Sequence, residues 1–206
     1  MRIAADLPIG DVVVADEQTA GQGRHGHTWQ SDRGMGLYCS IVLEPTPLLT
    51  LALGLATAEA LAIPCDLRWP NDVMLDNKKV AGILVHLVDG KAIAGIGINL
   101  TQTRFPAELQ ATSIKLHTGR ELLPDELLDR LLDSIPHYTP LAPEDILRLF
   151  TRASSYAGGR RVVVHLPDGV IHGTTRGLNP DGYLIVRKDD GTDTLILAGG
   201  VRAAGA

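Results

Sequence analysis

The glycine-rich stretch of residues 20–29, here called the glycine-rich loop, lies between two predicted strands. It constrains the fold more than any other feature of the chain. Its potential cations are Arg24, His25 and His27. An apolar run at residues 12–15 precedes the stretch, and residues 37–43 follow it as a second predicted strand. Glycines let backbone N–H groups turn onto an anion, and an arginine fork suits phosphate or carboxylate. We therefore expect a flexible loop that covers an anionic ligand.

Two phosphate-binding fingerprints match this loop by letter. Gly21, Gly23 and Gly26 reproduce the G-x-G-x-x-G spacing, and the same glycines come within one residue of a P-loop. Both motifs require a helix directly after the glycines. Residues 29–36 carry two more glycines and no helical period, so the order is strand–loop–strand and neither fingerprint holds. A glycine-rich surface loop without function is the alternative.

Composition, net charge and cysteine content exclude several classes of protein and ligand. The 206 residues are 45% hydrophobic and 21% charged, which suits one sizeable domain plus a small one. A net charge of −5 disfavours general nucleic-acid binding, and the apolar run at residues 51–63 is too short to span a bilayer. Cys39 and Cys65 form no C-x-x-C pair, and His25 and His27 have no further ligand nearby, so we expect no metal site. The sequence predicts a cytoplasmic protein that binds neither nucleic acid nor membrane.

Three segments have helical patterns. Residues 51–62 are apolar nearly all round, which is typical of a helix buried against a sheet. Residues 124–135 are amphipathic with proline and acids in the first turn, and a further helix is expected from about residue 143 to 156. Residues 101–120 have little period and are expected to form a long polar connection.

A β-hairpin over residues 80–99 carries a second candidate ligand site. Lys79 and Asn99 lie at its open end. The glycines within it are Gly82, Gly95 and Gly97. Isolated glycines in strands cost packing and indicate that another group approaches closely. We expect a flat slot for a small ligand, with a bulge or bend as the alternative for any single glycine.

The character of the chain changes after residue 157. Short β runs alternate with glycine turns over the remaining residues, a pattern typical of a small barrel. We expect a domain of residues 1–157 that carries the chemistry and a barrel of residues 158–206 that has no obvious chemistry of its own.

Four motifs occur together and in order: residues 18–29, Arg68-Trp-Pro-Asn-Asp72, residues 78–84 and residues 95–99. With them the chain resembles a biotin–protein ligase (biotin–[acetyl-CoA-carboxylase] ligase) of the class lacking a DNA-binding domain, over residues 8 to 206. The resemblance implies an α+β fold, in which a mixed-sheet catalytic domain of the biotin/lipoate ligase type precedes an SH3-like β-barrel.

The resemblance also implies a reaction in two steps. Biotin and ATP, with Mg²⁺, give biotinyl-5′-AMP, and the biotinyl group then passes to a lysine of a biotin carboxyl carrier protein domain. A homodimer is a further expectation. Because attack on the α-phosphate builds negative charge, the reaction needs cations more than a protein nucleophile. Lys79 is the first candidate for this catalytic role and Arg24 the second.

The resemblance assigns the other site residues in two sets. Those expected to bind biotin are Gln18, Gly21, Gln22, Gly23, Arg24, Lys79, Gly82, Leu84 and Gly95. Those expected to bind ATP or the adenylate are Arg24, His25, Gly26, Trp29, Asn71, Asp72, Lys79, Gly97 and Asn99. The glycine-rich loop is expected to order around the adenylate, because a mixed anhydride hydrolyses if it is wet.

The chain departs from the family pattern in three places. His25 and His27 stand in a loop that is usually richer in arginine, and Arg68 stands where a lysine is usual. These changes predict a softer, pH-sensitive charge. Only residues 1–10 precede the first strand, whereas the family has a strand, a helix and a Ser-Thr-Asn segment there. We expect either a late translation start or a shortened enzyme, with residues 1–7 as the tail of a helix. Biotin affinity should then be lowered by about thirtyfold to a thousandfold.

Two alternatives remain open. A lipoate/octanoate–protein ligase or transferase has a similar fold, although the Trp-Pro-Asn-Asp motif and the loop speak against it. The second alternative is a non-catalytic module that binds biotin or the carrier protein. Such a module would be expected to lack Lys79 or Arg24, and both residues are present. A repressor role is not expected, because no DNA-binding domain is apparent.

Overall fold

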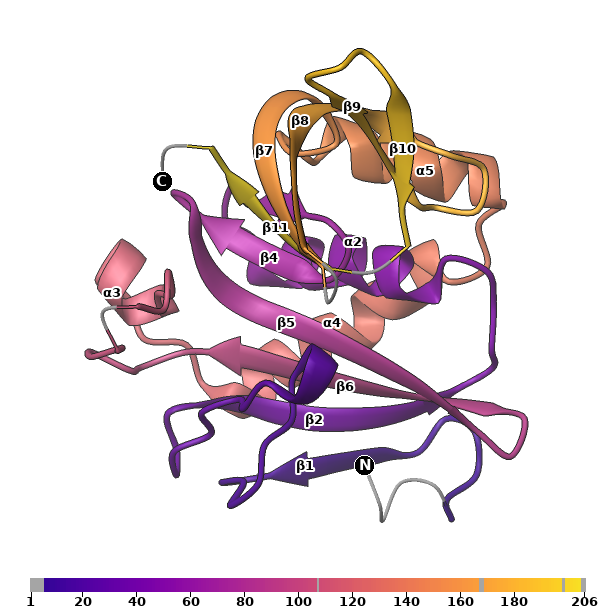
Figure 1. Cartoon of the computed structure of the whole chain (residues 1–206). Coiled ribbons are helices and arrows are strands. Elements are labelled where there is room, and N and C mark those ends of the chain that lie inside the picture. Colours follow the sequence, from indigo (N-terminus) through magenta and orange to yellow (C-terminus); the bar gives the residue numbers. More distant parts are fainter. Residues whose placement is uncertain (1–5, 107, 167–168, 198, 205–206) are drawn as a thin grey trace.

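The structure, a computed structural model, describes residues 6–106, 108–166, 169–197 and 199–204. It contains two β-sheets and a set of helices that lie against one face of the larger sheet (Figure 1). This arrangement confirms the α+β class. The helix tail expected at the N-terminus falls mostly on residues 1–5, which lie outside the described residues.

The larger sheet has six strands in the order β1-β2-β6-β5-β4-β3. Their bounds are Val12–Ala15 (β1), Gly36–Leu43 (β2), Asp66–Arg68 (β3), Asp72–Leu75 (β4), Lys78–Val88 (β5) and Lys91–Asn99 (β6). A mixed sheet was expected, but every strand pair here is antiparallel. Tight turns join β3 through β6, and such turns can connect only antiparallel strands. A parallel pairing occurs as an isolated bridge between Lys79 and Ala111.

Helices cover one face of this sheet. The helix α2 (Leu49–Leu61) is buried between the sheet and α4 (Pro124–Tyr138), which explains its uniformly apolar sequence. The helix α5 (Pro143–Arg152) ends a turn earlier than predicted, where Ser154 donates a hydrogen bond to the carbonyl of Leu67 at 2.6 Å. The short helix α3 (Ile114–Thr118) was not predicted. In the described residues, no helix has the length and apolar character needed to cross a membrane.

The other face of the sheet carries the glycines. Alternate residues of a strand point to opposite faces. The residues at 37, 39 and 41 of β2 and at 94, 96 and 98 of β6 belong to the core beneath the helices. Tyr38, Gly97 and Gly82 pair across three strands on the opposite face, and Ser40, Gly95 and Leu84 pair in the next row. This face lies below the glycine-rich loop.

The smaller sheet has five strands in the order β10-β9-β8-β7-β11. Their bounds are Gly158–Leu166 (β7), Gly169–Leu178 (β8), Leu184–Lys188 (β9), Asp193–Ile196 (β10) and Gly200–Ala203 (β11). The first four of these strands match the short β runs expected from the sequence, whereas β11 was not predicted as a strand. Within the described residues no pairing joins β10 to β11, so the ladder of the expected barrel is open there.

Both sheets share one core. Val162 and Leu184 of the smaller sheet belong to the same buried cluster as α2 and the larger sheet. The indole nitrogen of Trp69 donates a hydrogen bond to the carbonyl of Gly182 at 2.8 Å and so links the β3–β4 turn to the smaller sheet. The division at residues 157 and 158 coincides with the start of β7, and as a domain boundary it stays a prediction.

Candidate functional site

Two cavities meet on the glycine-bearing face of the larger sheet. One has a volume of about 530 Å³ and is lined only by residues between 17 and 97, including Gln18, Gln22 and Leu84. The other, of about 520 Å³, is lined by residues from both sheets. We call them the inner and the outer cavity. The residues that line both are Gly23, Arg24, Trp29, Asn71 and Lys79. The two predicted catalytic cations therefore stand at the junction.

A β-bulge in β5 places Lys79 on this face. Met74 pairs with Lys79 but Val73 pairs with Ala81, so Val80 is the extra residue. In a regular strand, Lys79 and Gly82 would point to opposite faces because their separation is odd. The extra residue restores them to the same face. A Cβ atom built on Gly82 would lie 2.9 Å from the Lys79 ammonium, which verifies that the two residues are neighbours.

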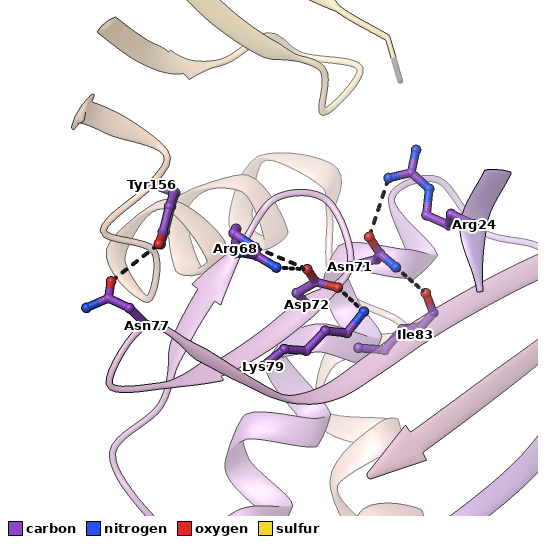
Figure 2. A network of polar contacts seen from close by, with 8 residues as sticks. All are labelled: Arg24, Arg68, Asn71, Asp72, Asn77, Lys79, Ile83 and Tyr156. Carbon is purple, nitrogen blue, oxygen red and sulfur yellow. Dashed lines mark hydrogen bonds and ion pairs between the residues drawn. The ribbon is translucent and has the colours of Figure 1, made fainter. Parts of the chain in front are cut away.

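Asp72 lies between two cations (Figure 2). Its Oδ1 accepts from the Lys79 Nζ at 2.5 Å, and its Oδ2 accepts from Arg68 at 2.6 and 3.1 Å. Burial by itself would raise the pKa of this carboxyl, but the charges and hydrogen bonds of Lys79 and Arg68 outweigh it and hold the pKa below its usual range. Asp72 is therefore an ionised anchor that fixes the Lys79 ammonium.

The Trp69–Asn71 turn links Asp72 to Arg24. The Nη1 of Arg24 lies 3.4 Å from the Oδ1 of Asn71, whose own Nδ2 donates to the carbonyl of Ile83 at 2.9 Å. Burial lowers the pKa of Arg24, and the charge of Asp72 opposes that shift. Three cations thus surround one carboxylate, and the excess positive charge at the junction suits an anionic ligand.

The base of the glycine-rich loop is closed by its own hydrogen bonds. The amide of Trp29 donates to the carbonyl of Gly21 at 2.9 Å, and the amide of Gly23 donates to the carbonyl of His27 at 2.7 Å. A side chain at Gly21 would collide with the carbonyl of Trp29. Gly21 therefore shapes the loop and lines neither cavity. Residues 24–26 form a single 3₁₀ turn at the apex.

The indole of Trp29 packs against two of the strand glycines, which leaves no room for a side chain at those positions. A Cβ atom on Gly97 would lie 2.6 Å from the Trp29 indole, and one on Gly82 would lie 3.2 Å from it. The group that approaches these glycines closely is thus a side chain of the chain itself, where the sequence predicted a ligand. The Lys79 ammonium lies 5.2 Å from the indole centroid, within range of a cation–π contact. Trp29 forms a wall between the cavities.

The predicted residues divide as follows. The inner cavity is lined by Gln18, Gln22, Gly23, Arg24, Lys79, Gly82, Leu84 and Gly95, and also by Gly97, which was assigned to the nucleotide. The outer cavity is lined by Arg24, Trp29, Asn71, Asp72, Lys79 and Asn99. Gly26 lines neither, and the side chain of His25 lies outside the described part of the chain.

In the structure, the side chain of Asn99 forms hydrogen bonds within the protein itself. Its side-chain amide donates to the carbonyl of Thr112 at 3.0 Å, and its Oδ1 lies 3.4 Å from Gln102. Asn99 thereby holds the segment that follows β6 against the sheet. Its predicted contact with the nucleotide stays a prediction.

Sequence reasoning overlooked three parts of the outer cavity. Arg68 was noted as a departure but not as a site residue, because its contact with Asp72 depends on the pairing of β3 with β4. The backbone of Lys79 pairs with Gln110 and Thr112 at 2.7 and 2.9 Å, and this segment forms a wall for which its polar, aperiodic sequence gave no signal. Residues 199–202 of the smaller sheet form another wall, so that sheet contributes to the site.

The fold thus provides two adjoining cavities, with Lys79 and Arg24 at their junction. The profile of the biotin/lipoate A/B protein ligase family matches residues 4–102, and that of the biotin protein ligase C-terminal domain matches residues 157–201. The chain belongs to the biotin/lipoate A/B protein ligase family.

Individual relatives agree with this assignment. The biotin–[acetyl-CoA-carboxylase] ligase of Mycobacterium tuberculosis is 32% identical, over 93% of this chain and 77% of its own length. The bifunctional ligase/repressor BirA of Bacillus subtilis is 31% identical over 90% of this chain, which spans 64% of that relative. The Aquifex aeolicus biotin protein ligase in complex with biotin and ATP has a TM-score of 0.86 at 33% identity, covering 98% of this chain and 94% of that one.

Proposed function

We propose that this chain is a biotin–protein ligase, a biotin–[acetyl-CoA-carboxylase] ligase that activates biotin with ATP and transfers it to a carrier lysine. The observation that carries the proposal is the pair of joined cavities with Lys79 and Arg24 at their junction. Biotin occupies the inner cavity with its carboxylate at the junction, and ATP occupies the outer cavity with its α-phosphate there. The Aquifex aeolicus relative, crystallised with biotin and ATP, supports this assignment.

In the first step, a carboxylate oxygen of biotin attacks the α-phosphorus, the bond to the bridging oxygen of the β-phosphate breaks, and pyrophosphate leaves. Both reactants are anions, so their approach is unfavourable without cations. Lys79 and Arg24 neutralise the carboxylate and the non-bridging phosphoryl oxygens as charge builds on them. Asp72 positions Lys79 through the 2.5 Å contact, and Arg68 keeps Asp72 ionised and oriented.

In the second step, the amine of the carrier lysine attacks the acyl carbon of biotinyl-5′-AMP. The bond from the acyl carbon to the phosphate oxygen breaks, AMP leaves, and the amine loses a proton. Before that step the mixed anhydride must be kept from water. The glycine-rich loop and Trp29, which wall the junction, are placed to exclude it.

We expect the magnesium ion to enter as part of the metal–ATP substrate. Magnesium commonly uses substrate phosphates, water and one or two carboxylates. Among the described residues no three His, Cys, Asp or Glu side chains gather to hold a metal. Both oxygens of Asp72, the carboxylate nearest the junction, are occupied by cations. This geometry does not suit a resident metal site, and we assign no step to the metal.

The inner cavity favours biotin over a lipoyl or octanoyl group. Its walls carry the polar side chains of Gln18, Thr19, Gln22 and Ser40 in addition to the glycines. A straight alkyl chain offers these groups no hydrogen bond, whereas a cyclic urea can pair with those that lack a partner in the protein. The non-catalytic alternative is disfavoured because both cations of the junction are in place.

The test is biotin-dependent ATP–pyrophosphate exchange, followed by transfer of labelled biotin to a carboxyl carrier domain. We expect exchange with biotin and none with lipoate or octanoate, and then label on the carrier lysine. Exchange driven by lipoate or octanoate instead would assign the chain to the other branch of the family. Biotin binding without exchange would make it a binding module.

A further inference from the structure

Ser40 differs from the other serine and threonine residues that are buried in the described part of the chain. It lies in the middle of β2 and is 6% exposed, yet its side chain has no hydrogen-bond partner among the described residues. Each of the other fully buried serines and threonines in the described ranges has a partner. For example, Thr57 donates to the carbonyl of Leu53 at 2.7 Å, and Ser134 donates to that of Arg130 at 2.8 Å. The Ser40 oxygen is not among the fully enclosed unpaired atoms, so this hydroxyl is free to bond a molecule that enters the space beside it.

The sheet register directs Ser40 into the inner cavity. Ser40 pairs with Gly95, which pairs with Leu84, and this row lies on the face opposite the helices. Because Gly95 has no side chain, nothing on β6 covers the hydroxyl. Ser40 lines the inner cavity together with Gln18 and Thr19. The hydroxyl therefore opens into the inner cavity.

The position of Ser40 along the cavity indicates which part of a ligand it meets. Lys79 and Arg24 mark the junction end, where the carboxylate of biotin is activated. Ser40, like Gln18, lines the inner cavity only, away from the wall shared with the outer cavity. On the proposed function, which this inference rests on and deepens, that end of the cavity holds the bicyclic ring of biotin.

We infer that the Ser40 hydroxyl donates a hydrogen bond to an acceptor on the biotin ring and is a specificity-determining residue for biotin. The acceptor is the ureido carbonyl oxygen or the ring sulfur, both of which offer lone pairs. The contact is present before and during activation alike, so it contributes to binding without changing the rate of the chemical step.

The test compares Ser40→Ala with the matched control Ser134→Ala, whose hydroxyl lies on α4. We expect Ser40→Ala to raise the KM and the calorimetric Kd for biotin by about 5- to 30-fold, with kcat unchanged. Its ligand-free thermal midpoint should stay the same, because the hydroxyl has no hydrogen bond within the described residues to lose. Ser134→Ala should leave the KM and the Kd for biotin unchanged, because its hydroxyl bonds only to the carbonyl of Arg130 within α4.

Desthiobiotin, which keeps the ureido ring but has no sulfur, identifies the acceptor. A Ser40→Ala penalty that is equal for biotin and desthiobiotin assigns the ureido oxygen, and a penalty confined to biotin assigns the sulfur. Unchanged KM and Kd for biotin in Ser40→Ala would overturn the inference, as would a lower kcat accompanied by a lower midpoint. Failure of the proposed function is distinguishable, since the unmodified chain itself would then show no exchange with biotin.

Discussion

The inner and outer cavities have similar volumes but differ in charge. Charged side chains that line only the outer cavity include Arg68, Asp72 and Arg202. Glu17, which lines only the inner cavity, is paired with Arg33 at 2.7 Å. The other residues that line the inner cavity and not the outer one are neutral. On the proposed function, charge is therefore concentrated where the phosphate would bind and react, while neutral hydrogen-bonding groups are left to recognise the ring of biotin.

The cavities also differ in which parts of the chain build them. The inner cavity is made by the loop and the larger sheet, within residues 17–97. The outer cavity draws on the segment after β6 and on β11 as well. Substitutions at the charged junction should therefore lower the rate of adenylate synthesis. Substitutions where the two sheets meet, at the hydrogen bond from Trp69 to Gly182, should lower the free energy of unfolding.

Removal of the Lys79 charge should have the largest effect. We expect Lys79→Ala to lower adenylate synthesis by about a hundredfold or more, corresponding to about 3 kcal/mol of lost transition-state stabilisation. Pyrophosphate exchange measures this effect. The matched control is Lys78→Ala, whose exposed side chain precedes the site and should leave exchange unchanged. Near-normal exchange in Lys79→Ala would remove Lys79 from the mechanism.

Neutralisation of Asp72 should reduce stability in a pH-dependent way. Asp72→Asn leaves Arg68 and Lys79 without their shared anion, at a cost of about 2–4 kcal/mol in the free energy of unfolding at pH 7. The pKa of Asp72 is lowered in the folded state, so its contribution is present above the unfolded pKa of about 3.9 and is lost as the pH falls through the folded value.

Urea unfolding of both proteins from pH 7 to pH 3 checks this prediction. The difference between Asp72→Asn and the unmodified chain should be largest near neutrality and should narrow as the pH falls below about 4. The exposed Asp76→Asn variant is the matched control and should differ little at any pH. A difference that is constant with pH would contradict the ion-pair account of Asp72.

Substitution at Gly97 tests the wall between the cavities. A methyl group there would lie 2.6 Å from the Trp29 indole, so the ring must move. We expect Gly97→Ala to cost about 1–3 kcal/mol, visible as a raised KM for ATP and a shift in tryptophan fluorescence. Gly158→Ala, where no atom lies within 4 Å of the added group, should change neither. Normal ATP kinetics in Gly97→Ala would disprove the role of Trp29 as a wall.

Ligands should protect the glycine-rich loop. Residues 22–31 contain Arg24, one of the two cations of the junction, which should gain a charged partner when an anion is bound, so tryptic cleavage after Arg24 should slow several-fold with biotin and ATP. Because the loop base is closed by hydrogen bonds, the effect should be greatest near the 3₁₀ turn. The Lys79→Ala variant, which should form the adenylate much more slowly, should lack most of the protection. Equal cleavage rates with and without ligands would refute a closing loop.

The smallest effect on stability is expected where the two sheets meet, at the contact between Trp69 and Gly182. Trp69→Phe removes the hydrogen bond to Gly182 and should lower the free energy of unfolding by about 1 kcal/mol, measured by urea titration. Trp29→Phe provides the comparison for stability alone, because the buried indole nitrogen of Trp29 has no partner in the described residues and its removal should be close to neutral. A larger loss for Trp29→Phe would reverse this assignment.

Local patterns were enough to predict most elements of the fold. The strand at Val12–Ala15, the start of α4 at Pro124 and the return strand Lys91–Asn99 were placed correctly because each carries its own period and boundary residues. The four motifs likewise placed the candidate ligand residues on the inner cavity and at the junction. Such signals lie within a few neighbouring residues and therefore survive in the sequence.

Tertiary structure decided the rest. The bulge at Val80 turns Lys79 onto the face of Gly82, and only pairing with β4 reveals it. The approach of Trp29 to Gly97 shows that a side chain of the protein fills the space expected for a ligand. The walls formed by residues 108–111 and 199–202 come from segments far apart in the chain. A sequence records what each residue prefers locally, but which faces meet depends on strand register and on packing between distant elements.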